Sequence, residues 1–65
     1  MSDYQTYATK REATAAIDKL QGWPNARLDR LYLPDDPNAD SRGDVWVIQL
    51  SANPLQYLRA DGYAR

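Results

Sequence analysis

The small supply of large apolar side chains is the feature that most limits how this chain can fold. The sequence has seven Leu, two Ile, two Val and two Trp, and its other apolar residues are mainly nine Ala and five Tyr. A chain of 65 residues with so few strong core formers can bury only one small core, because small domains remove less of their surface from water. We therefore expect a single domain over residues 1–65, of marginal stability or supported by association.

Two absences from the composition narrow the range of functions. Without Cys and His, the chain lacks thiol nucleophiles, disulfides, the commonest metal ligands and the commonest general base. The remaining carboxylates would need a substrate pocket, which a domain of this size does not readily enclose. The sequence therefore predicts a protein that is not an enzyme and holds no cofactor.

The charge and hydropathy patterns bear on partners and location. Eight Lys and Arg against nine Asp and Glu give a net charge of −1, which provides no long-range attraction to nucleic acid or to an acidic membrane. No apolar run reaches the length of a membrane span, and the first residues lack the pattern of a signal peptide. We expect a cytoplasmic protein with no membrane partner.

The first third of the chain predicts a strand followed by a helix. Alternation over Asp3–Ala8 is typical of a short strand. Thr9 and Glu12 have the spacing of a capping box, so a helix should begin at Lys10. This helix has a narrow apolar face and a glycine just past its end, at the left-handed position that favours glycine. The residues concerned are Ala13, Ala16, Ile17, Leu20 and Gly22.

The rest of the chain predicts two strands and one ambiguous segment. Residues 26–33 predict a strand whose alternation is imperfect, which allows a bulge, and Asp44–Ser51 alternate clearly as a strand does. A Pro- and Asp-rich exposed loop over 34–43 joins the two strands. Residues 54–61 fit two structures. Pro54 at a first helical position is typical of a short helix, whereas the alternation of Leu55 and Tyr57 with polar Gln56 is typical of a hairpin strand. Both alternatives stay open at this point.

These elements predict the fold class α+β. We expect a small, mostly antiparallel sheet of three to four strands in the order β-α-β-β, with one helix on one face. The strand 44–51 is apolar on both sides, and the helix can cover only one, expected to be the side of Trp46. The other side would then be exposed as an interface, unless loops or Trp23 fold over it. The predicted interface residues are Val45, Val47, Tyr57, Leu55 and Trp23.

Three motifs suggest other chemistry. Asp36, Asn38 and Asp40 resemble the start of a calcium loop, but Ser41 replaces the required Gly and Val47 replaces the required Glu, so we expect a turn and no metal site. The tripeptide 42–44, Arg-Gly-Asp, matches an adhesion motif and is better explained as a tight turn. Single-stranded nucleic acid is the alternative partner, held by stacking and cationic side chains. Its candidate residues are Tyr57, Arg59, Tyr63 and Arg65.

No family motif is evident in the chain. Compact, slightly acidic α+β chains of this length without Cys and His are similar in kind to accessory proteins of bacteriophages and mobile elements, including small inhibitors of host defence. The expected function is a non-enzymatic protein-interaction module that forms a homodimer or docks a protein partner. The apolar sheet face or an exposed edge strand would form the contact.

Overall fold

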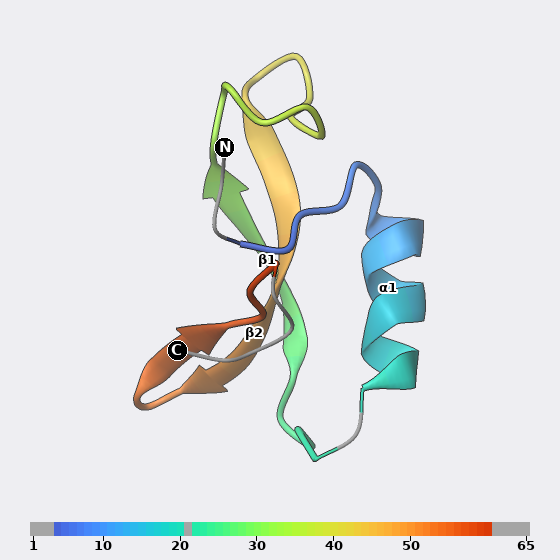
Figure 1. Ribbon diagram of the computed structural model, residues 1–65, viewed down its shortest axis with the longest axis vertical. Helices are drawn as coiled ribbons and strands as arrows, with labels where there is room; N and C mark the ends of the chain where they lie inside the picture. The colour runs from blue at the N-terminus through green and yellow to red at the C-terminus, as the bar shows by residue number, and fades with distance from the viewer. Residues whose placement is uncertain (1–3, 21, 61–65) are drawn as a thin grey trace.

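A computed structural model describes residues 4–20 and 22–60 and contains one helix and one three-stranded antiparallel sheet (Figure 1). The strand order in the sheet is β1-β2-β3. The α+β class is therefore confirmed. The elements are α1 (Lys10–Lys19), β1 (Arg27–Tyr32), β2 (Asp44–Ala52) and β3 (Leu55–Tyr57).

Helix α1 begins where the capping box predicts. Thr9 is extended, with φ −132° and ψ 155°, and its side chain accepts a hydrogen bond from the Glu12 backbone N–H at 3.2 Å. Ala13 is fully buried, and the other apolar residues of this face are half-buried. The helix lies alongside the sheet and contacts both β1 and β2 (Figure 1). Gly22 follows with φ +84°, the positive value that its position predicts. Within the described residues, no helix is long and apolar enough to cross a membrane.

Strands β1 and β2 form a regular antiparallel pair. Their register runs without interruption from Arg27 opposite Gln49 to Tyr32 opposite Asp44, so the bulge allowed in residues 26–33 is absent. The irregularity lies instead between β2 and β3, at Gln49 and Ser51. The connection 34–43 forms turns at one end of the sheet, as predicted (Figure 1).

The prediction of a first strand over Asp3–Ala8 is wrong. Of Asp3–Ala8, Asp3 lies outside the described residues, and the remainder makes only two isolated bridges, Tyr4 with Arg59 and Tyr7 with Trp46. Tyr7 and Trp46 exchange two backbone hydrogen bonds of 2.8 and 3.1 Å. The segment cannot continue along β2, because the next position on that edge, the Ile48 carbonyl, accepts the Leu58 N–H at 2.9 Å.

The segment 54–61 forms a strand, and the helical alternative is wrong for its described part. β3 covers Leu55–Tyr57, the Leu58 N–H after it still donates to the Ile48 carbonyl of β2, and Arg59 forms an isolated bridge with Tyr4. The Asn53–Pro54 bond is cis, and the chain reverses there to bring β3 against β2. The last residue of the predicted helix, Asp61, lies outside the described residues.

The prediction that one side of β2 is exposed is also wrong. Val45, Val47 and Ile48 are 0% exposed, and Leu50 is 2% exposed, so β2 is buried on both sides. Together with Ala13 these residues form the buried apolar core. The second side of β2 is thus covered within a single copy of the chain.

A tyrosine side chain crosses the sheet on the side of β2 that carries Val47. The Tyr57 hydroxyl donates a hydrogen bond of 3.0 Å to Asp29 Oδ2. Tyr57 lies opposite Gln49 in the β2–β3 pairing, and Asp29 lies opposite Val47 in the β1–β2 pairing. The Tyr57 side chain therefore spans β2 on the side that carries Val47. The Tyr4 ring packs edge-on against it, with ring centroids 5.6 Å apart. We call Tyr4 and Tyr57 the tyrosine strap.

Candidate protein-interaction surface

The five predicted interface residues fall into two groups. Val45 and Val47 are buried, and Tyr57 is half-buried in the tyrosine strap, so these three do not form an exposed apolar face. Trp23 and Leu55 are exposed, at 37% and 58% of their surface. The exposed part of the predicted interface is therefore reduced to Trp23 and Leu55.

Trp23 and Leu55 belong to segments at one end of the molecule. The connector between α1 and β1, which contains Trp23, and the β2–β3 turn, which precedes Leu55, both lie at the end opposite the loop 34–43 (Figure 1). An open hollow of about 440 Å³ joins these two segments, and we call it the polar hollow. Its lining residues are Asn25, Arg27, Ser51, Ala52 and Asn53.

The polar hollow is not predicted from the sequence. Its residues come from the connector and the start of β1, and from the end of β2 with the following turn, which the register of the sheet brings together. Arg27 pairs with Gln49, two residues before Ser51. Only the register places these side chains around one space, and no local pattern in the sequence carries that information.

The residues proposed for nucleic-acid binding are partly outside the description. Tyr63 and Arg65 lie outside the described residues. Tyr57 and Arg59 do lie close together, but both contact Tyr4: the Arg59 guanidinium is 5.3 Å from the Tyr4 ring centroid. Burial raises the pKa of Tyr57, and the adjacent Asp29 carboxylate raises it further. In this structure Tyr57 and Arg59 therefore pack against Tyr4 of the tyrosine strap.

The carboxylates of the 34–43 loop are engaged in local turns. Asp36 Oδ1 accepts hydrogen bonds from the Asn38 backbone N–H at 2.8 Å and from the Thr6 hydroxyl at 3.0 Å. The Asn38 side-chain amide also donates to Thr6, both to its hydroxyl oxygen and to its carbonyl. Asp36 and Asn38 thus act as turn residues that attach the loop to the N-terminal segment. They belong to the calcium-like motif, which the sequence analysis interpreted as a turn.

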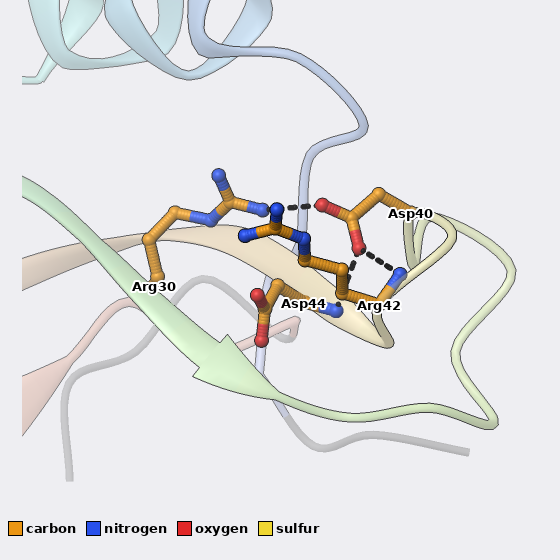
Figure 2. A network of polar contacts seen from close by, with 4 residues as sticks. All are labelled: Arg30, Asp40, Arg42 and Asp44. Carbon is orange, nitrogen blue, oxygen red and sulfur yellow. Dashed lines mark hydrogen bonds and ion pairs between the residues drawn. The ribbon is translucent and has the colours of Figure 1, made fainter.

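A second network closes the loop beside β1 (Figure 2). Asp40 Oδ1 accepts from the backbone N–H groups of Arg42 and Asp44, at 2.8 and 3.1 Å, and Asp40 Oδ2 pairs with Arg30 at 2.9 Å. The N–H of Asp44, then that of Arg42, and the Arg30 guanidinium lower the pKa of Asp40. Gly43 completes the turn with φ +87°. The Arg-Gly-Asp tripeptide is therefore part of a tight turn, as predicted.

Trp46 lies on the side of β2 that the helix is expected to cover, but it is not part of the buried core. It is half-buried, and the Arg30 guanidinium lies 4.3 Å from its ring centroid. Arg30 lies opposite Trp46 in the β1–β2 pairing, so both side chains extend from the same side of the sheet. A cation placed over an indole face in this way is attracted by the electrons of the ring. Arg30 therefore connects the Asp40 turn to the edge of the core.

Comparison with protein-family models, with curated proteins and with solved structures finds no match to this chain. Its function is therefore argued from its surface. Two features of that surface point to a ligand or a partner: the exposed residues Trp23 and Leu55, and the polar hollow formed by the segments that contain or adjoin them.

Proposed function

We propose that this protein is a non-enzymatic interaction module that docks a protein partner at the end of the molecule bearing Trp23 and Leu55. The observation that carries the proposal is the exposure of these two large apolar side chains on the segments that form the polar hollow. Tryptophan is strongly enriched among the residues that dominate binding energy at protein interfaces. Exposed apolar side chains on segments that also carry polar groups have the composition of an interface with a polar rim.

The acidic groups support the non-enzymatic part of the proposal. Asp36 and Asp40, the carboxylates at the centre of the acidic loop, accept hydrogen bonds from turn N–H groups and from Thr6 or Arg30. The pKa of Asp40 is lowered, so it is ionised at neutral pH and suited to binding cations rather than to donating a proton. Both carboxylates thus have structural roles.

The cellular context is part of the same proposal. We propose a cytoplasmic location, because the chain has no Cys and therefore none of the disulfides that stabilise many small secreted domains. Its similarity in size and composition to accessory proteins of phages and mobile elements suggests that the partner is a host protein. One such partner would be a host-defence protein that this module inhibits.

Burial of the valines changes the basis for association. A homodimer through Val45 and Val47 would require these side chains to leave the core. Self-association of the exposed end remains the other form of the proposal, and it would bury Trp23 and Leu55 of both copies. Sedimentation across a hundredfold range of concentration separates the two forms, because only self-association depends on the concentration of this chain.

The test compares two exposed apolar positions. We expect the parent to retain a defined protein from a bacterial lysate, and the Leu55→Lys variant to lose it. Tyr32→Lys is the matched control, because Tyr32 is 69% exposed and lies at the other end of β1. Equal capture by the parent and by Leu55→Lys, with a parent that is monomeric at every concentration, would contradict the proposal. Capture that nuclease or moderate salt abolishes would favour the nucleic-acid alternative.

A further inference from the structure

We infer that the polar hollow receives a carboxylate of the partner, presented on an acidic peptide segment that also places an apolar side chain against Trp23 or Leu55. This inference rests on the proposed docking function and specifies the chemistry of the partner.

The lining of the hollow matches an anion. Arg27 supplies a guanidinium with several N–H donors, and the neighbouring side chains add two primary amides and one hydroxyl. All of its lining residues are neutral except Arg27, so no carboxylate in the lining neutralises that charge. A planar guanidinium pairs with a carboxylate through two parallel hydrogen bonds, which gives both strength and orientation.

Arg27 also differs from two other arginines of the chain. The Arg30 guanidinium is paired with Asp40 and lies over Trp46, and the Arg59 guanidinium lies over Tyr4. Within residues 4–20 and 22–60, by contrast, no hydrogen bond or ion pair to the Arg27 side chain is found. Arg27 is therefore placed to pair with a group from outside the chain.

Charge and apolar surface together favour a peptide over nucleic acid. One arginine lines the hollow and the chain has a net charge of −1, whereas polyanions are held by several cations. Trp23 and Leu55, each two residues along the chain from a lining residue of the hollow, expose apolar surface that an apolar side chain could cover. A peptide with an acidic residue beside an apolar one supplies both groups.

The need for an acidic residue beside an apolar one also argues against a second copy of this chain as the occupant. Its own acidic loop, 34–43, contains no apolar residue larger than Ala apart from its prolines. The carboxylates of Asp36 and Asp40 are already engaged within the same copy, by Asn38 and Thr6 and by Arg30. A copy that inserted this loop would leave Trp23 and Leu55 uncovered.

The probe for the test is a hexapeptide of alternating leucine and glutamate, blocked at both ends. Its control is the same peptide with glutamine in place of glutamate. Binding is followed by nuclear magnetic resonance, through the side-chain N–H signals of Arg27, Asn25 and Asn53. We expect saturable shifts with the acidic peptide and binding at least about tenfold weaker with the neutral one, because a hydrogen-bonded charge pair is lost.

Variants and other anions complete the test. Arg27→Gln should weaken binding of the acidic peptide by a similar factor, whereas Arg11→Gln, on the exposed surface of α1, should leave it unchanged. Equal binding of the two peptides, or shifts that inorganic phosphate reproduces at the same concentration, would overturn the inference. The same holds if these signals shift when the protein alone is concentrated, because a second copy would then be the occupant.

The outcomes also separate this inference from the proposed function. If Leu55→Lys abolishes partner capture and Arg27→Gln does not, the docking function stands and the carboxylate inference fails. If neither variant changes capture, the docking function itself fails. Because the comparison of the two peptides uses the parent protein, it stays informative even if Arg27→Gln does not fold.

Discussion

Replacing Tyr57 with Phe tests whether the tyrosine strap holds the second side of β2. The substitution keeps the ring over Val47 and removes only the hydroxyl that donates to Asp29 at 3.0 Å. Asp29 Oδ1 keeps its other hydrogen bond, from the Arg30 backbone N–H at 2.8 Å. The variant therefore isolates the contribution of one cross-sheet hydrogen bond.

The expected cost follows from the charge and burial of the two groups. A hydrogen bond to a charged group contributes roughly 1.5–3 kcal/mol, and because both side chains are half-buried, water replaces part of it, which leaves about 1–2 kcal/mol. A chain of this length should have a free energy of unfolding of about 3–10 kcal/mol. For such a small domain the loss corresponds to a fall in melting temperature of about 4–16 °C.

The pH dependence gives a second, independent readout. The pKa of Tyr57 is raised above its ordinary value of 10.0 because of burial and the adjacent Asp29, so the folded state holds this proton more tightly than the unfolded state. The resulting stability is fully present below pH 10 and is lost as the pH rises through the folded-state pKa. The difference in melting temperature between the parent and Tyr57→Phe should therefore be constant near neutrality and shrink above pH 10. Burial also raises the pKa of Tyr7, but both proteins share that effect and it cancels in the difference.

Circular dichroism melts of the parent, Tyr57→Phe and Tyr32→Phe measure both quantities. Tyr32 is 69% exposed, and its hydroxyl has no hydrogen bond within the described part of the chain, so its variant should melt with the parent. A Tyr57→Phe protein that melts within a degree of the parent at pH 7 would refute the reasoning. So would a difference that stays the same at pH 11.

Four further predictions concern the helix cap and the loop. Thr9→Ala removes the acceptor of the Glu12 N–H and should cost about 0.5–2 kcal/mol in thermal unfolding. Gly43→Ala should cost about 1–3 kcal/mol, because φ is +87° and the new Cβ would lie 2.8 Å from Tyr32 Cε1. The pKa of Asp40 is lowered, chiefly by the N–H of Asp44, so the parent should lose stability as the pH falls below 3.8, and Asp40→Asn should lose less over that range. Millimolar calcium should leave the melting temperature unchanged, because the calcium-like motif lacks its Gly and Glu.

Each of these expectations has an outcome that contradicts it. A Thr9→Ala or Gly43→Ala protein with the parental melting temperature would show that the cap or the turn does not limit stability. Identical acid unfolding of the parent and Asp40→Asn would remove Asp40 from the pH dependence. A rise of several degrees on addition of calcium would make the loop a metal site.

The elements that the sequence predicts well are those determined by neighbouring residues. The spacing of Thr9 and Glu12 fixes the start of α1, since the cap is a bond between residues three apart. Alternation of apolar residues likewise locates β1 and β2, because side chains in a strand point to opposite sides in turn. These signals depend little on how the rest of the chain folds.

The features that the sequence does not predict depend on contacts between distant residues. Tyr57 and Asp29 are 28 positions apart, and Thr6 and Asp36 are 30 apart. Alternation places Val47 on one side of its strand, but it does not say which other segment covers that side. The predicted exposure of Val47 failed for this reason. The polar hollow was missed for the same reason, because it depends on the register that brings Arg27 to the end of β2.

Burial of Val47 also changes what an association experiment can show. If β2 were exposed on its valine side, Val47→Lys would separate copies or partners and leave the fold intact. Because Val47 is 0% exposed and lies beneath the tyrosine strap, a lysine there would place an unpaired ammonium in the core, and the expected result is loss of the fold. Leu55→Lys places the same charge at a residue that is 58% exposed, so its melting temperature should stay close to that of the parent. A Val47→Lys protein that folds but no longer binds its partner would show that the valine side of β2 is the interface. The proposal that the partner docks at the end bearing Trp23 and Leu55 would then be wrong.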